Sequence, residues 1–169
     1  EAPKPKWNWW NPAPGTPTSQ WRTTPVAIDW NKDGILDLVM LDHEGYLAFF
    51  EGFVRDGEHI LKPGARIFAC KNGCVYNNRK GITDKTPGLL RLNDLEAGQS
   101  GRRKICFTDW DKDGKLDLII DGRYGANWFR QMNTGKKGIV HFMYMGALSS
   151  TRLEGHTPNP PPVDWNGDG

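Results

Sequence analysis

The stretch DWNKDGILD, Asp29 to Asp37, is followed 80 positions later by DWDKDGKLD, Asp109 to Asp117. In each copy oxygen-bearing side chains occupy positions 1, 3, 5 and 9, and glycine occupies position 6. A third start, DWNGDG, stands at 164–169, which is 55 positions beyond the second. Repetition over tens of residues indicates an architecture built from similar units, so the nonapeptide decides how the rest of the chain is interpreted.

The sequence around each nonapeptide has the pattern of short strands. An apolar run precedes the loop at 26–28 and 105–107, and LDLVM or LDLII follows it. An aromatic run, GYLAFF or ANWFRQM, comes after the next turn. These runs are too short for buried helices and rich in branched residues, and no segment has a helical period of useful length. The chain is therefore predicted to be all-β, with each unit a β-meander.

The spacing of the repeats suggests blades of a β-propeller. A spacing of 55 residues suits one four-stranded antiparallel blade, and the longer spacing predicts an insertion near 70–87. The expected organisation is a Pro/Trp-rich leader at 1–24, a first blade at 25–102, a second at 103–157 and a truncated third at 158–169. Propellers need about four to eight blades. We therefore expect an incomplete propeller, completed by a C-terminal continuation or by another chain.

The nonapeptide has the composition of a calcium loop. Carboxylates crowded into nine residues repel one another by about 1 kcal/mol per close pair even in water, so the loop calls for a cation. Alternate oxygen ligands with glycine at the bend suit Ca²⁺, whereas Mg²⁺ demands stricter octahedral geometry and zinc prefers nitrogen and sulfur. The predicted side-chain ligands are Asp29, Asn31, Asp33 and Asp37, then Asp109, Asp111, Asp113 and Asp117, then Asp164, Asn166 and Asp168. The backbone carbonyls of Ile35 and Lys115 are predicted to add one ligand each.

The loop also resembles an EF-hand loop and a plain hairpin turn. An EF-hand needs an acidic ligand at position 12 and a following helix, but Met40 and Ile120 occupy that position inside predicted strands. A plain hairpin turn would explain a single Asp-Gly pair, but two full copies and a third start favour calcium. Because the second loop has four carboxylates and the first has three, we expect tighter binding at the second. Both loops should bind Ca²⁺ with a Kd of about 0.1 to 1 mM, as extracellular modules do.

Composition excludes some partners. Lys+Arg 22 against Asp+Glu 20 leaves a formal net charge of +2, too small to predict binding to nucleic acid or to an anionic membrane. No apolar stretch is long enough for a membrane span. Removal of an export signal would leave first residues such as EAPKPKWNWW, but so would a cloning boundary. The expected location is outside the cytoplasm: secreted, periplasmic or at the cell surface.

The three cysteines cannot all pair within the chain. Cys70 and Cys74 flank the turn tripeptide KNG and could form a bridge if the chain is exported. Cys106 lies in an apolar run and is predicted to be a buried thiol. A zinc site would need a fourth ligand that no spacing indicates.

The pattern of strand, DxDxDGxxD loop, LDL strand, turn and aromatic strand resembles the FG-GAP and VCBS repeats. The resemblance covers about 25–53 and 103–169. It implies calcium-stabilised propellers, as in integrin α-subunits, fungal lectins and secreted bacterial proteins. The ending GHTPNPPPVDWNGDG is similar to repeats of bacterial polysaccharide-degrading proteins, including rhamnogalacturonan-lyase-like propellers.

The resemblance also implies a ligand face opposite the calcium loops. Its candidate ligand-binding residues are Trp21, Arg22, His43, Arg102, Arg123, Tyr124 and His156. Asp42, Glu44 and Arg103 share that face. Aromatic and arginine side chains suit stacking on sugar rings and pairing with uronate carboxylates. The implied partner is therefore an oligo- or polysaccharide, and these polar residues could equally be ordinary loop residues.

The tryptophans divide into three groups. Trp30, Trp110 and Trp165 recur at position 2 of each loop and are expected to pack the loop against its neighbour. Trp128, in an aromatic strand, is expected in the core. The leader holds Trp7, Trp9 and Trp10, which could clamp across blades or form a platform for sugars.

The sequence leaves catalysis open. A polysaccharide lyase would need a base, an acid and a positive charge, and a glycoside hydrolase would need two spaced carboxylates. No spacing singles out either constellation, and nucleophile signatures such as GxSxG are absent. The leading expectation is a glycan-binding or glycan-processing module. The alternatives are part of a lyase or related enzyme, and a protein-interaction module of the integrin type.

Overall fold

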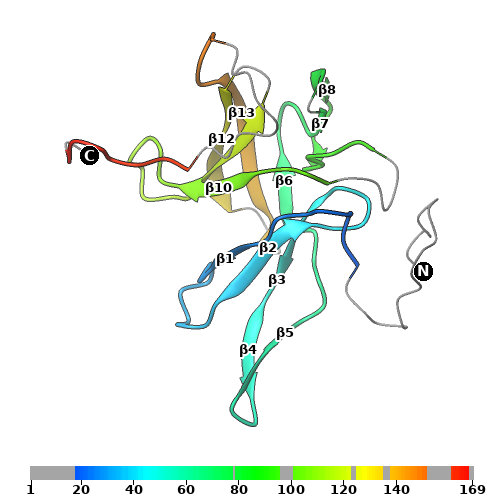
Figure 1. Ribbon diagram of the computed structural model, residues 1–169, viewed down its shortest axis with the longest axis vertical. Helices are drawn as coiled ribbons and strands as arrows, with labels where there is room; N and C mark the ends of the chain where they lie inside the picture. The colour runs from blue at the N-terminus through cyan, green and yellow to red at the C-terminus, as the bar shows by residue number, and fades with distance from the viewer. Residues whose placement is uncertain are drawn as a thin grey trace.

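The computed structural model describes residues 18–77, 79–95, 101–122, 125–134, 138–151 and 161–167. Within these ranges the chain is all-β, as the sequence predicts, and has no α-helix. The described residues accordingly include no helix long and apolar enough to cross a membrane. The strands form two main sheets and two separate hairpins (Figure 1).

The first sheet contains the strands around the first nonapeptide. It has the order β1-β2-β3, with β1 at Val26–Ile28, β2 at Asp37–Leu41 and β3 at Leu47–Phe50. Both pairings are antiparallel, and the loop joins β1 to β2 so that Ile28 lies opposite Asp37. The three strands are the meander that the alternation of apolar runs and turns predicts.

The second sheet has six strands in the order β10-β11-β12-β13-β6-β9. The first four form an antiparallel meander: β10 (Ile105–Thr108), β11 (Asp117–Gly122), β12 (Gly125–Thr134) and β13 (Val140–Ala147). The second nonapeptide joins β10 to β11 just as the first joins β1 to β2. This half of the sheet therefore has the antiparallel meander expected of the second unit.

The first unit differs from the expected four-stranded meander. β6 (Phe68–Cys70) pairs with β13 in parallel and with β9 (Gly88–Leu89) in antiparallel, so it belongs to the second sheet. All three residues of β6 are buried. A strand buried in this way needs neighbours on both sides, which the outer edge of β13 and β9 supply.

Two hairpins are not paired into either sheet. β4 (Gly52–Arg55) and β5 (Glu58–Leu61) extend away from the other strands (Figure 1). β7 (Val75–Asn77) and β8 (Gly81–Asp84) form the second hairpin, which lies inside the predicted insertion at 70–87. The predicted insertion therefore contains two strands, of three and four residues.

One hydrophobic core joins the two sheets. It includes Val39 and Leu47 from the first sheet and Phe68, Phe129 and Phe142 from the second. The apolar faces of both repeats are thus buried together, which a sheet with one apolar face requires.

The tryptophans at position 2 have different environments. Trp30 packs edge-on against Phe68 and Phe107, with ring centroids 5.3 and 5.2 Å apart. It links the first loop to the second sheet, as its repetition predicts. By contrast, Trp110 is 44% exposed and Trp165 is 91% exposed, so the packing predicted for them is wrong.

Two further expectations about buried side chains need correction. Trp128 is only partly buried, because residues alternate sides along β12 and its neighbour Phe129 faces the core instead. Cys106 is also only partly buried, since β10 is an edge strand of the sheet.

Candidate metal centre

The two nonapeptide loops have the same backbone conformation. Lysine at position 4 has a positive φ in both, 61° for Lys32 and 59° for Lys112. Glycine at position 6 follows with φ of 86° for Gly34 and 83° for Gly114. Two left-handed residues within three positions turn the chain sharply, and glycine tolerates this at little steric cost. The repeated sequence therefore encodes a repeated bend.

The carboxylate at position 1 stabilises that bend in both loops. Asp29 accepts hydrogen bonds from the backbone N–H groups of Asp33 (3.0 Å) and Gly34 (2.9 Å). Asp109 accepts the equivalent bonds, both at 2.9 Å. At position 7, Ile35 and Lys115 donate their N–H groups to the carboxylate at position 5.

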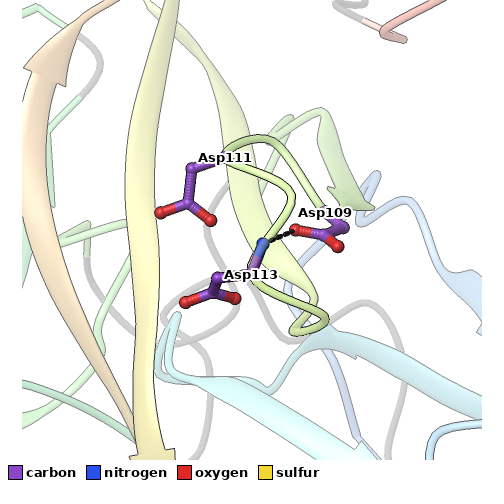
Figure 2. A group of neighbouring side chains, drawn as sticks. All are labelled: Asp109, Asp111 and Asp113. Carbon is purple, nitrogen blue, oxygen red and sulfur yellow. Dashed lines mark hydrogen bonds between the residues drawn. The ribbon is translucent and has the colours of Figure 1, made fainter.

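The second loop gathers three carboxylates around one point. Oxygens of Asp109, Asp111 and Asp113 all lie within 4.8 Å of one another. Figure 2 shows the three side chains on the single loop between β10 and β11, with Asp113 N–H bonded to Asp109. Oδ1 of Asp111 is buried and has no hydrogen-bond partner among the described residues. A ring of oxygens with one acceptor unsatisfied fits a hard cation.

The equivalent group in the first loop replaces one carboxylate by an amide. Asn31 donates its amide N–H to Asp33 at 2.8 Å, and its Oδ1 accepts the Asp33 backbone N–H at 3.1 Å. The side chains at positions 3 and 5 therefore contact each other here, while the carboxylate at position 1 bonds to the backbone of position 5. At these three positions the first loop has two carboxylates and one amide, so it carries one negative charge fewer than the second.

The aspartates at position 9 are buried and connect each loop to a neighbouring strand. Asp37 accepts the N–H groups of Trp30 (3.0 Å) and Gly52 (2.7 Å). Asp117 accepts the N–H of Gln131 (2.6 Å) and the indole N–H of Trp128 (2.9 Å). Both are fully buried.

In the second loop, burial also changes the pKa of the aspartate at position 9, Asp117. It raises the pKa of Asp117, and the nearby charges of Asp111 and Asp113 raise it further. The ionised form of Asp117 is therefore disfavoured by its like-charged neighbours. A cation beside them would relieve that repulsion.

The second loop carries basic neighbours that the first lacks. Arg130 forms ion pairs with Asp111 and Asp113, and Lys115 contacts Asp113 at 2.8 Å. These contacts lower the pKa of Asp113, the hydrogen bond from Lys115 most strongly. Sequence reasoning missed Arg130, although alignment of the repeats would have found it. The first repeat has Glu51 in its place and Ile35 in place of Lys115.

No protein-family model, curated protein or solved structure matches this chain. The likeness to FG-GAP and VCBS repeats therefore depends on the loop motif and on the meander around it.

The third start is described only in part. Gly167 has a φ of 73° and donates its N–H to Asp164 at 2.7 Å, so the loop begins with the same kind of bend. Asn166 is described too, whereas Asp168 lies outside the described residues.

Several predicted ligand-face segments lie next to one another. Ser19 bridges to Asp42, and the N–H of Gly101 donates to the carbonyl of Trp21 at 2.8 Å. The chain before β1 therefore runs beside the β2–β3 turn and beside the segment that holds Arg102. Three other predicted members, Arg123, Tyr124 and His156, and the leader tryptophans Trp7, Trp9 and Trp10 lie outside the described residues.

Two predicted ligand residues form a stack in the first of these segments. The guanidinium of Arg22 lies 3.7 Å from the ring centroid of Trp21, which is 42% exposed. Arg22 has a φ of 60°. His43 lies in the β2–β3 turn with Nε2 at 3.9 Å from a carboxylate oxygen of Glu44.

An arginine cluster beside this turn was not predicted. Arg66 forms ion pairs with Asp42 and Glu44 and lies over the ring of Tyr46, 4.1 Å from its centroid. Its hydrogen bond lowers the pKa of Glu44. Arg91 approaches the same ring at 5.5 Å. Nothing in the sequence pattern signals this cluster, because Arg66 and Arg91 come from irregular segments far from the repeat.

Arg103, predicted on the ligand face, is instead buried. It pairs with Asp121 at 3.2 Å, and both side chains are almost inaccessible to solvent. Its guanidinium lies 5.0 Å from the ring of Tyr76. Tyr76 accepts a hydrogen bond from Asn127 at 3.0 Å, so this network joins the insertion hairpin to the second sheet.

Proposed function

We propose that this chain is a calcium-binding β-module in which each nonapeptide loop holds one Ca²⁺. The observation that carries the proposal is the convergence of Asp109, Asp111 and Asp113 within 4.8 Å in a loop whose backbone is repeated at 29–37. Two acidic turns without a shared ligand would not need the same two left-handed residues in both copies of the loop. A repeated ion site would, because ligand positions depend on the bend.

Calcium suits this donor set better than other common ions. The converging atoms are carboxylate and amide oxygens, which hard ions prefer. Cysteine and histidine are absent from both nonapeptides, so thiophilic metals have no ligand there. Mg²⁺ would demand near-ideal octahedral geometry and keep several waters, whereas Ca²⁺ accepts a less regular set of oxygen ligands such as this loop offers. Bound Ca²⁺ would neutralise the loop and fix the turn between its two strands.

Thermal unfolding of chelator-stripped protein tests the proposal. At about 10 mM Ca²⁺ and a Kd of about 0.1 to 1 mM, mass action stabilises each loop by about 1 to 3 kcal/mol. For a chain of this size the Tm should rise by roughly 3 to 10 °C per loop. Equal Mg²⁺ should have a much smaller effect.

Matched variants assign the effect to the loops. Asp29→Asn and Asp109→Asn should each remove part of the calcium-dependent shift. Glu58→Gln, at an exposed position of the β4–β5 hairpin, should leave the whole shift intact. A Tm that is the same with calcium and with chelator rejects the proposal.

We further propose that the module belongs to an exported, propeller-type protein that binds or processes glycans. Weak calcium sites are useful only where calcium is plentiful, which supports export. The Trp21–Arg22 stack, beside the segments of Asp42 and Arg102, supports a carbohydrate ligand. An exposed aromatic ring can stack on a sugar, and a guanidinium can pair with a uronate carboxylate.

Binding to neutral and uronate-containing oligosaccharides tests this wider role. Glycan binding that Trp21→Ala abolishes supports it. Unsaturated uronate products, detected by ultraviolet absorbance, would instead identify a lyase. A chain that binds no glycan but captures a protein would be an interaction module of the integrin type.

A further inference from the structure

Two cysteines meet where the insertion hairpin leaves the second sheet. Cys70 ends β6 and pairs with Phe142 on one side and Gly88 on the other. Cys74 lies just before β7, and its thiol donates to the carbonyl oxygen of Cys70 at 2.7 Å. Both side chains are buried, at 1% and 3% exposure. Neither takes part in the calcium loops or the arginine cluster.

The turn between the cysteines is held in one conformation. The side chain of Asn72 accepts the N–H of Tyr144 at 2.8 Å and donates to its carbonyl at 3.1 Å. Gly73 has a φ of 116°, a conformation that L side chains rarely adopt. The N–H of Cys74 donates to the carbonyl of Asp84 at 2.9 Å. The backbone on both sides of the pair is thus fixed before any bond between the sulfurs forms.

The two thiols also affect each other. Burial raises the pKa of Cys70 to about 11, and the neighbouring Cys74 contributes to the increase. Cys106 is a poor alternative partner. Its neighbours Ile105 and Phe107 on β10 face the core that contains Cys70 and Cys74, so the Cys106 side chain points to the other face of that strand.

We propose that Cys70 and Cys74 form an intramolecular disulfide in an oxidising environment, by exchange with a low-molecular-weight disulfide such as oxidised glutathione. One cysteine thiolate attacks the small disulfide, forms a mixed disulfide and releases one thiol. The second thiolate then attacks the protein sulfur of the mixed disulfide and expels the second thiol. Two protein thiols are oxidised to one disulfide while one small disulfide is reduced to two thiols, which carry the two protons.

The bond would fasten the β7–β8 hairpin to the second sheet. Tyr76 of that hairpin is buried against Arg103 and Asn127, so opening the hairpin would expose the network around them. Because both sulfurs are shielded in the folded chain, exchange should proceed during folding or when the hairpin opens. Once closed, the bond should be protected from reductants by the same burial.

Peptide mapping tests the bond directly. The chain is refolded in a glutathione redox buffer, alkylated with iodoacetamide in denaturant and digested with trypsin. Cleavage after Lys71, between the two cysteines, should leave IFACK (67–71) and NGCVYNNR (72–79) joined until a reductant is added. One alkylated cysteine, Cys106, should remain. Chain refolded with a reductant throughout should show three alkylated cysteines.

Variants exclude other pairings. After oxidative refolding of Cys106→Ser, iodoacetamide should alkylate neither of the two remaining cysteines. Cys70→Ser and Cys74→Ser should not form an internal disulfide. Three alkylatable cysteines after oxidative refolding would overturn the proposal. So would glutathione adducts without the linked peptides, or a link that includes Cys106. Since the readout is covalent, it does not depend on whether the loops bind calcium.

Discussion

Replacing Arg130 by glutamine should strengthen calcium binding at the second loop. Its guanidinium pairs with Asp111 and Asp113, which belong to the same carboxylate group that would hold the ion. A divalent cation therefore has to displace a positive charge that is already there. The charge count alone, four carboxylates against three, predicts tighter binding at the second loop, but Arg130 and Lys115 offset that advantage.

The size of the effect follows from two contributions. A partly exposed guanidinium–carboxylate pair such as Arg130 with Asp111 contributes at most about 1 kcal/mol after solvent screening. A positive charge roughly 7 Å from a divalent ion adds a repulsion of about 1 kcal/mol at the dielectric constant of water. Since 1.4 kcal/mol is a tenfold change, Arg130→Gln should tighten binding by roughly 5- to 30-fold.

Calorimetric titration isolates this site when the first loop is disabled. The background variant is Asp29→Asn with Asp33→Asn, and the titration is repeated with Arg130→Gln. Glu51→Gln is the matched control, because Glu51 occupies the same place in the first repeat and pairs with Lys62 at 2.7 Å. In a background in which the second loop is disabled instead, Glu51→Gln should not tighten Ca²⁺ binding at the first loop. Equal or weaker binding in Arg130→Gln would refute the reasoning.

Three further predictions concern packing and charge. Trp30→Ala should destabilise the fold by about 2 to 4 kcal/mol in denaturant unfolding, because its ring packs on the core residue Phe68 and on the partly buried Phe107. Trp110→Ala at the same repeat position should cost about 0.5 kcal/mol or less, because Trp110 is 44% exposed. Arg103→Met and Asp121→Leu should each cost about 3 to 5 kcal/mol because each leaves a buried charge unpaired, while the double variant should recover much of the loss. The pKa of Glu44 is lowered by its arginine partner, so its stabilisation is present above the unfolded pKa of 4.5 and lost as pH falls through the folded value. The Tm difference between wild type and Glu44→Gln should therefore disappear in acid, and a constant difference across pH would contradict this.

Local sequence patterns predicted those parts of the fold that depend on neighbouring residues. The nonapeptide specifies its own bend, since Asp109 bonds to amides four and five positions later. The strands beside it follow from apolar runs of three to six residues. Trp30 was predicted correctly because repetition indicated packing, and its ring does reach across to the second sheet.

The failures come from pairings between distant segments. β6 lies opposite β13 although more than 60 residues separate them, and no local pattern distinguishes that edge from the edge of the first sheet. Trp110 shares the sequence context of Trp30, but its side chain is 44% exposed. The Arg66 cluster was missed for a similar reason, since it joins side chains from irregular segments.

The proposed calcium sites are the clustered oxygens of the two nonapeptide loops. Equilibrium titration of chelator-stripped wild-type chain with Ca²⁺ measures this most directly. We expect two Ca²⁺ ions to bind per chain with a Kd of about 0.1 to 1 mM, and one ion when either Asp29 or Asp109 is replaced by asparagine. Heats no larger than those of dilution, or binding unchanged by both substitutions, would contradict it.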